Sequence, residues 1–497
     1  MMNSVPQALA VARRWRAPIM AIALLATVAG CTTNPATGES NFTPFMSPAQ
    51  EAAVGRAEHP KLLAAMGGAY DERGALTRYV AKIGRRLQAV SEMPSPPFTF
   101  TIVNSDEINA FALPGGYVYV TRGLIALADS EAELAGVLAH EIGHVTARHT
   151  AQRYNQSVFA QLGAAMLGNA IGSRAVGDLA RYGVAAYVQQ FSREQELQAD
   201  ELGIRYLTRS GYDPRAMASF LATMQAESAL SRRIAGKTGA APEASLFSSH
   251  PRTVVRVRRA ADLARASHPT GLRVAHDEYL LAIDDTLFGD DPEQGYRRGR
   301  VFSHPKLGFR FEVPPGFRLR NTPQAVLASN AADTVIRFDG ARVAVGLSMP
   351  RYLADVWFPK LSLRTIEAIT VNGMAAVTAS ARVNTNRGPR DIRAIAIRFD
   401  RETVYRFLIL SPPKITAALN VGLRRMTFSF RHLTPAEIAA LKPLRIRVHR
   451  VAAGETVATL AATLPYTDFQ AERFRVLNGL RPGEGLAAGG LIKLIDE

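Results

Sequence analysis

The chain has 497 residues and a formal net charge of +16, with 47% hydrophobic and 21% charged residues. This length suffices for about three domains of ordinary size, and the composition excludes a small disulfide-bonded module and a disordered chain. The single cysteine, Cys31, excludes an intrachain disulfide bond. The charge is uneven, because residues 301–440 carry +11 and residues 32–300 carry no net charge. Of the 59 basic residues 51 are arginine and alanine is abundant, a pattern that genome base composition can produce without selection for binding. No nucleic-acid partner is expected.

Residues 13–16 hold three arginines and precede an apolar run over 17–29, which ends in Val28-Ala29-Gly30-Cys31. This order is typical of a secretory signal, and the run is too short to span a membrane. Its ending resembles the bacterial lipobox, which implies a signal peptide over 1–30 and lipidation of Cys31. Thr32 stands where an inner-membrane retention signal would have aspartate. The resemblance therefore implies a periplasmic protein anchored to the inner face of the outer membrane.

The mature chain is expected to begin with a polar tether over residues 31–47 and to continue as a mainly helical α+β domain over 48–290. Within that domain the hydrophobic pattern predicts helices over 49–66 and 75–92, strands over 98–103 and on both sides of Pro114, helices over 130–228, and a loop over 229–250.

Residues 301–440 are expected to form a second, basic α+β domain. Alternating residues predict a strand near Phe309–Val313 and a hairpin over 392–410, followed by a helix over 415–427. Its charge predicts an anionic partner such as anionic lipid or lipopolysaccharide, and the alternative is a solvated arginine-rich face.

Residues 443–497 resemble a LysM module, a small βααβ domain. The resemblance lies in the segments around Val448–Val457, Leu477–Leu480 and Gly489–Leu494. It implies binding to N-acetylglucosamine polymers such as peptidoglycan, although a fold does not by itself establish a function.

Residues 140–144 read His-Glu-Ile-Gly-His, an HExxH motif. Ser130 and Glu133 predict a capping box ahead of it, which places the motif inside a helix. Two histidines four positions apart lie one turn apart on one helix face, so both imidazoles can reach one zinc ion. Glu141 lies beside them, where it can take a proton from water at the metal. The alternative is a solvated helix that carries two histidines by chance.

A third ligand has to come from elsewhere in the chain. Thr150 occupies the position at which a metzincin has its third histidine. His149 lies nine residues after the first histidine of the motif, so helical geometry points it to the opposite side and predicts a packing or hydrogen-bonding role. A gluzincin takes a glutamate from a later helix, for which Glu194, Glu196 and Asp200 are candidates. Glu196 and Asp200 share a helix face, so one can bind zinc while the other supports the site.

Four motifs in this order, over about residues 48–265, resemble the CAAX prenyl protease family of zinc metallopeptidases (HtpX/BepA-like gluzincins), in its soluble periplasmic BepA-like branch. The motifs are Asn109-Ala110-Phe111-Ala112-Leu113-Pro114-Gly115-Gly116, the HExxH motif, Ser192-Arg193 with Glu196 and Asp200, and His250-Pro251 with Arg256.

The resemblance implies one zinc ion per chain, bound by His140, His144 and Glu196. It further implies that Glu141 is the catalytic base and Asp200 a catalytic proton donor. Arg193 and Arg256 are expected to support the site from behind the ligands. Glu194 is set aside because the family places the ligand three residues after the arginine.

Two further segments are expected at the site. The strand of Asn109, Ala110, Phe111 and Ala112 is a candidate edge to which an extended substrate adds, and the alternative is an ordinary hairpin. His250 is a candidate plug, because the resemblance implies that this histidine can occupy the open zinc position. The alternative is that His250-Pro251 merely ends the loop.

These features predict an outer-membrane-anchored zinc endopeptidase that cleaves misfolded or stalled envelope proteins in quality control. The alternative is a non-proteolytic assembly factor or peptidoglycan-bound scaffold with a closed or vestigial zinc site. The intact general base favours the enzyme, because a scaffold has no need of it.

Overall fold

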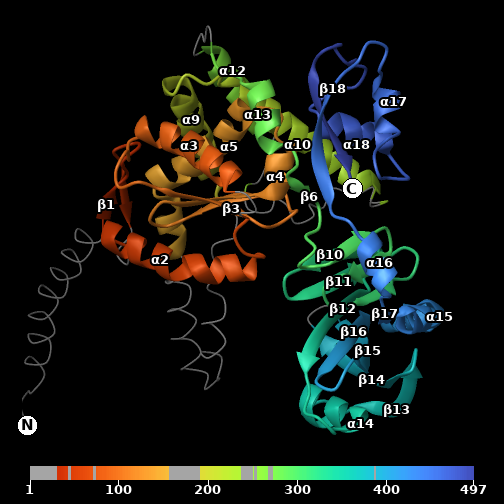
Figure 1. The fold of residues 1–497 in the computed structure, drawn as a ribbon. Coiled ribbons are helices and arrows are strands. Elements are labelled where there is room, and N and C mark those ends of the chain that lie inside the picture. Colours follow the sequence, from red (N-terminus) through yellow and green to blue (C-terminus); the bar gives the residue numbers. More distant parts are fainter. Residues whose placement is uncertain are drawn as a thin grey trace, which may run out of the picture. The chain divides into compact units, whose positions relative to one another are not determined.

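The computed structural model describes residues 31–42, 46–70, 74–155, 191–234, 236, 250, 254–266, 272–385 and 388–497 (Figure 1). The predicted signal peptide and most of the predicted loop over 229–250 lie outside the described residues. Among the helices that are described, none has the length and apolar character needed to cross a membrane. Helices and sheets both contribute, so the predicted α+β class is confirmed.

Contacts between Cα atoms divide the chain into two compact units. Unit 1 comprises residues up to 64, 68–284 and 448–494, and unit 2 comprises 65–67, 285–447 and 495–497. Residues 448–494, predicted as part of a separate module, therefore cluster with the domain that carries the HExxH motif.

Unit 1 is mainly helical. Its helices before the C-terminal segment are α2 (Pro48–Ala65), α3 (Ala75–Ala89), α4 (Arg122–Leu127), α5 (Glu131–Thr146), α9 (Arg193–Arg209), α10 (Arg215–Ile234), α12 (Val254–Ala266) and α13 (His276–Ile283). Its first strands are β1 (Cys31–Thr33), β2 (Ser40–Phe42), β3 (Thr99–Val103), β4 (Ala110–Leu113) and β5 (Tyr117–Thr121).

The segment predicted as a tether contains a short hairpin, because β1 pairs antiparallel with β2. The Asn34 side chain accepts hydrogen bonds from the backbone N–H groups of Ala36 and Thr37. Gly38 supplies a positive φ of 76°. The Asn34 side-chain hydrogen bonds and the left-handed backbone of Gly38 reverse the chain. The tether was predicted from polarity and proline content, which do not reveal this turn.

The sheet β3-β5-β4 forms the centre of unit 1, with β5 parallel to β3 and antiparallel to β4. Helix α2 packs on β5, where His59 Nδ1 lies 2.6 Å from the hydroxyl of Tyr119. Helix α3 approaches β3 closely, because a Cβ on Gly84 would lie 2.3 Å from the ring of Phe100. In Figure 1 the sheet lies between α2 and the helices α3 and α5. The HExxH helix is therefore packed directly on the sheet.

Unit 2 is built on a seven-stranded antiparallel sheet in the order β10-β11-β12-β16-β15-β14-β13 and a four-stranded sheet in the order β17-β9-β8-β7. Its strands are β6 (Leu287–Phe288), β7 (Tyr296–Arg298), β8 (Val301–His304), β9 (Phe309–Glu312), β10 (Arg318–Thr322), β11 (Ala325–Ser329), β12 (Val335–Arg342), β13 (Arg364–Val371), β14 (Met374–Thr385), β15 (Gly388–Arg398), β16 (Thr403–Ser411) and β17 (Arg431–His432). Its helical segments are α14 (Met349–Arg351), the π-helix η2 (Tyr352–Trp357), α15 (Pro413–Ser429) and α16 (Pro435–Ala440).

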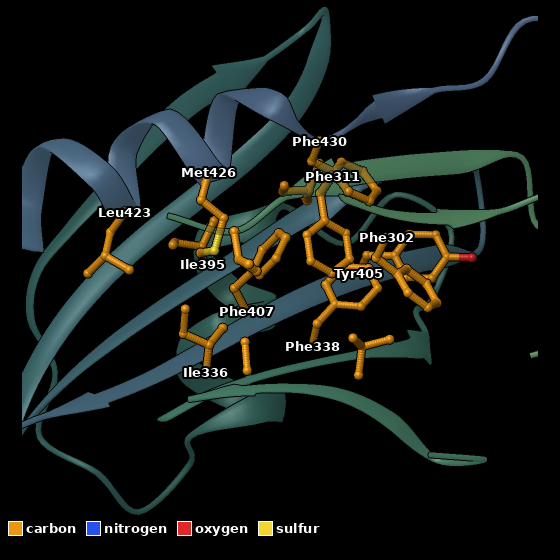
Figure 2. Close-up of a cluster of buried hydrophobic side chains, with 14 of the residues drawn as sticks. Phe302, Phe311, Ile336, Phe338, Ile395, Tyr405, Phe407, Leu423, Met426 and Phe430 are labelled. Atoms are coloured by element: carbon orange, nitrogen blue, oxygen red, sulfur yellow. The ribbon is translucent and has the colours of Figure 1, made fainter. Parts of the chain in front are cut away.

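Figure 2 shows the core of unit 2, where α15 lies on the large sheet. Leu423 and Met426 of α15 meet side chains such as Phe407 from β16. The rings of Phe311 and Phe338 lie 4.5 Å apart between centroids. Alternation along β9 places its phenylalanines in this core and leaves Arg310 and Glu312 partly exposed, as the sequence pattern predicts.

The C-terminal segment contains β18 (Leu444–Arg450), α17 (Val457–Ala461), α18 (Gln470–Leu477) and β19 (Leu491–Asp496). Its element order is the predicted βααβ. Thr456 caps α17 through a reciprocal pair of hydrogen bonds with Thr459. Asn478 joins the two halves, because its side chain bonds the backbone N–H and C=O of Lys493 at 2.6 and 3.0 Å.

Candidate metal centre

Helix α5 brings the two motif histidines together. It is buried along its whole length, and the Ser130 side chain caps its N-terminus by accepting from the Glu133 N–H. The predicted capping box forms only in part. Ser130 accepts from the Glu133 N–H as predicted, but the Glu133 carboxylate accepts from the N–H of Asp129 at 2.8 Å instead of from that of Ser130. The Nε2 atoms of His140 and His144 lie 3.1 Å apart. Both rings therefore point to one place.

Helix α9 supplies the carboxylate that faces these rings. Ser192 and Gln195 form a reciprocal capping box at its start. Glu196 is fully buried, with Oε1 3.5 Å from His144 Nε2 and Oε2 3.7 Å from His140 Nε2. Glu194 is exposed in the first turn. The structure thus brings Glu196 to the histidines and directs Glu194 to solvent.

His250 joins the same cluster. His140, His144, Glu196 and His250 each offer one ligand atom, and these four atoms lie within 4.8 Å of one another. His250 Nδ1 lies 2.8 Å from Glu196 Oε1, and its Nε2 lies 3.4 Å from Glu141 Oε1.

The donor set fits a zinc ion. Imidazole nitrogens and a carboxylate oxygen are the ligands that zinc prefers. Buried polar atoms ordinarily have partners, yet Glu141 Oε2 and His250 Nε2 are buried without a hydrogen-bond partner among the described residues. A site that binds a cation and a polar reactant is expected to have such atoms, which form no hydrogen bond, beside the convergent ligand atoms.

Asp200 holds His140 from behind. Its Oδ1 lies 2.9 Å from His140 Nδ1, the nitrogen opposite the one that faces the cluster. Arg256 donates to both Asp200 oxygens at 2.7 Å and also to Glu196. Burial would raise the pKa of Asp200, but these hydrogen bonds outweigh it and hold that pKa below its usual value. A carboxylate that fixes the ring of a ligating histidine orients it and strengthens it as a ligand.

His149 takes up the corresponding position behind His144. Helix α5 ends at Thr146, and Arg148 has a positive φ of 60°. The chain thereby turns back, so that His149 Nδ1 lies 2.9 Å from His144 Nδ1. The other nitrogen of His149 lies 2.7 Å from Gln198 Oε1. His149 therefore forms hydrogen bonds, as predicted. The prediction that it points away from the motif is wrong, because α5 ends before His149 and the chain turns.

The Gln198–His149–His144 chain determines which nitrogen of His144 carries hydrogen. Gln198 Oε1 can only accept, so His149 Nε2 donates to it and the Nδ1 of neutral His149 accepts. His144 must then donate from Nδ1, which leaves a lone pair on its Nε2, the atom that faces the cluster. Sequence reasoning missed Gln198 because its role depends on where the preceding helix ends.

Phe191 covers the same ring. Its ring stacks on His144 at a centroid distance of 3.8 Å, and the Arg153 guanidinium lies 3.6 Å from the Phe191 centroid. No sequence motif indicated either residue. Arg193, predicted to support the site, is exposed at the start of α9, and no hydrogen bond or ion pair joins it to the cluster in the described part of the chain.

The predicted substrate strand is β4, which lies at one edge of its sheet. Ala110, Phe111, Ala112 and Leu113 are nevertheless all buried. Asn109, just before the strand, is also buried, and its Oδ1 has no partner among the described residues. The edge exists as predicted, while its side chains are covered in this conformation.

Two histidines one helical turn apart, an adjacent glutamate and a second glutamate from a later helix are the arrangement found in HExxH metallopeptidases. Residues 75–264 match the family model of Peptidase family M48. This segment of the chain is therefore similar to M48 peptidase domains.

Curated relatives match the same region. The chain is 35% identical over 214 residues to the beta-barrel assembly-enhancing protease of Escherichia coli, and 36% identical over 220 residues to that of Yersinia pestis. It is 30% identical over 185 residues to the mitochondrial metalloendopeptidase OMA1 of Schizosaccharomyces pombe. These matches cover 41%, 42% and 37% of this chain and 42%, 42% and 51% of the respective relatives. The chain thus spans about half or less of the length of these relatives.

Proposed function

We propose that this chain is a zinc-dependent endopeptidase that hydrolyses peptide bonds of misfolded or stalled envelope proteins. The observation that carries the proposal is the convergence of His140, His144 and Glu196 beside Glu141, whose Oε2 is buried without a partner among the described residues. The matched relatives support it, because they are named as an assembly-enhancing protease and as metalloendopeptidases.

The residues divide the chemistry between them. His140, His144 and Glu196 would hold the zinc ion, which would supply Lewis acidity toward the scissile carbonyl and the attacking water. Glu141 accepts the proton of that water on Oε2 and delivers it to the leaving amine. Asp200 acts as a positioning residue rather than as the proton donor, because His140 and Arg256 occupy its oxygens.

His250 closes the resting site in this proposal. Its ring lies within hydrogen-bonding distance of Glu196 and close to Glu141. A fourth protein ligand would occupy the position that catalytic zinc sites keep open. Substrate or a partner then has to move His250, and uncover β4, before an extended peptide can bind.

We further propose that the other segments hold the enzyme in the envelope. A lipidated Cys31 anchors it to the inner face of the outer membrane, where the basic segment 301–440 meets anionic lipid or lipopolysaccharide. The LysM-like segment 443–497 contacts peptidoglycan. The support for these three roles is the sequence: the lipobox, the charge of +11 and the glycan-module resemblance.

A non-proteolytic scaffold is the second candidate function. The proximity of His250 to Glu196 favours it, since a permanently closed cluster would be structural.

Hydrolysis of casein by the purified full-length protein distinguishes the two. The proposal expects cleavage that a chelator abolishes and that added zinc restores. A protein that binds zinc and cleaves neither casein nor itself would support the scaffold instead.

A further inference from the structure

A cavity of about 30 Å³ lies between α5 and α10, next to the candidate metal centre. Groups of that centre line one part of it, among them Glu141 and His250. The remaining wall is apolar and consists of Val137, Met217, Phe220, Leu221 and Met224. The metal site and the general base have no need of these five side chains. An apolar hollow that opens onto reacting groups is the usual form of a substrate side-chain pocket.

The sequence builds this wall from one helical face. Met217, Phe220, Leu221 and Met224 follow one another at i, i+3, i+4 and i+7 along α10, so they lie on one side of it. On the facing helix α5, Gly136 lies one turn before His140 and lines the same cavity. A Cβ on Gly136 would come within 3.4–3.6 Å of Met217. The missing side chain of Gly136 therefore leaves part of the space.

The walls suit a guest larger than the present cavity. Methionine side chains are unbranched and adapt their shape to what they contact, and two of them line the wall. His250 lines the cavity as well, so displacement of its ring from the centre would also enlarge the space.

We propose that this pocket receives a large apolar side chain of the substrate residue next to the scissile bond. The enzyme then cuts beside leucine, methionine or phenylalanine in preference to alanine or charged residues. This inference rests on the proposed function. It gives a physical reason for acting on misfolded proteins, since folded proteins bury such side chains and misfolded ones expose them.

The test begins with the full-length, zinc-loaded protein and a denatured protein substrate, whose cleavage sites are mapped by mass spectrometry. One position next to the cut should be enriched in leucine, methionine and phenylalanine. Peptides that differ only at that position then give kcat/KM, and phenylalanine or leucine should exceed alanine by about 10–200-fold.

Gly136→Ala places a methyl group in the pocket at ordinary van der Waals distance from Met217, so the fold should tolerate it. Its ratio of kcat/KM for phenylalanine over alanine peptides should fall at least about tenfold. Gly485→Ala is the matched control, because nothing lies within 4 Å of its added Cβ, and its ratio should stay that of the wild type. If Gly136→Ala does not fold, Leu221→Ala should shift the preference toward larger side chains such as tryptophan.

Cleavage without an apolar preference, or a ratio unchanged in a folded Gly136→Ala, would overturn the pocket and leave the peptidase proposal standing. A wild-type protein that cleaves no substrate would overturn the proposed function and the pocket with it.

Discussion

Hydrogen bonds behind each histidine of the HExxH motif decide which of its nitrogens is available to a metal ion. Asp200 accepts from His140 Nδ1 at 2.9 Å, and neutral His149 does the same for His144. When both rings are neutral, these arrangements leave Nε2 without hydrogen on the side of the cluster. The two rings are therefore prepared as ligands before metal binds, although one partner is a carboxylate and the other a neutral ring.

His149→Ala should lower zinc affinity about 10–100-fold, the usual cost of losing such a partner. The measurement is zinc competition against a chelator of known affinity, together with the melting temperature to confirm folding. His59→Ala is the control, because His59 is also a hydrogen-bonded histidine of unit 1 but its partner is Tyr119. Equal zinc affinity in both variants would contradict the proposed role of His149.

His250→Ala should raise proteolysis, including self-cleavage, while zinc is retained by His140, His144 and Glu196. The reason is that His250 Nδ1 lies 2.8 Å from Glu196 and its removal opens the fourth position. Casein hydrolysis and zinc content are measured on the same preparations. Lower or unchanged activity with full zinc content would reject the plug.

Sequence spacing predicted the residues that converge, because four-residue spacing places side chains on one face of a helix. Glu196 and Asp200 show this, since both reach the histidines from α9. The same rule misplaced His149, because it assumes that the helix continues and α5 ends three residues earlier. Phe191 and Gln198 could not be predicted, since their contacts depend on packing between separate segments.

At the scale of elements, the first turn of α5 carries two carboxylates with opposite behaviour. Glu131 accepts from Tyr212 at 2.6 Å and Arg273 at 2.8 Å; burial opposes ionisation, but hydrogen bonds from Arg273, Tyr212 and Tyr79 lower its pKa to about 2. Burial, with the nearby charge of Asp129, raises the pKa of Glu133 to about 7. Ionised Glu131 therefore stabilises α5, whereas ionisation of Glu133 destabilises it.

Glu133→Gln should become progressively more stable than the wild type as pH rises. The raised pKa means that folded Glu133 holds its proton more tightly than unfolded Glu133, so wild-type stability falls between about pH 4.5 and 7. From pH 5 to 8 the difference in unfolding free energy, variant minus wild type, should grow by about 2 kcal/mol.

Denaturant unfolding at both pH values measures this difference. Glu131→Gln is the matched control, because the pKa of Glu131 is below pH 5 in both states and its difference should stay nearly constant from pH 5 to 8. A pH-independent difference for Glu133→Gln would contradict the raised pKa.

Regular elements follow from local patterns, and their ends depend on single residues. The predicted hairpin over 392–410 is present as β15 and β16, paired antiparallel. The hairpin of β1 and β2 was missed because Asn34 and Gly38, rather than hydrophobic alternation, determine it.

For the molecule as a whole, a buried lysine joins the C-terminal segment to the rest of unit 1. Lys493 is fully buried, and its Nζ donates to the carbonyl oxygens of Ala128 at 2.7 Å and Ala126 at 3.1 Å. These groups end α4, where a cation complements the helix dipole. Asp129 pairs with the same ammonium at 3.6 Å, just before the motif helix begins. Residues 448–494 therefore support the segment that leads into α5.

Lys493→Met should destabilise unit 1 by about 3 kcal/mol or more, because it leaves buried carbonyls and Asp129 without their cation. Thermal melting, and hydrogen exchange of β19 and α4, measure the loss. Lys442→Met is the control, because Lys442 is exposed and its replacement should leave both unchanged. If hydrogen exchange of β19 and α4 in Lys493→Met were as slow as in the wild type, the role of this lysine as an anchor would be contradicted.

The most direct test of the proposed zinc peptidase activity compares wild type with Glu141→Gln, with zinc content and casein hydrolysis measured on the same preparations. Glu141 is not one of the metal ligands in this account and serves as the base. Both proteins should hold one zinc ion per chain, and Glu141→Gln should lose nearly all hydrolysis. Full activity in Glu141→Gln, or wild-type protein without zinc that still cleaves casein, would contradict the account.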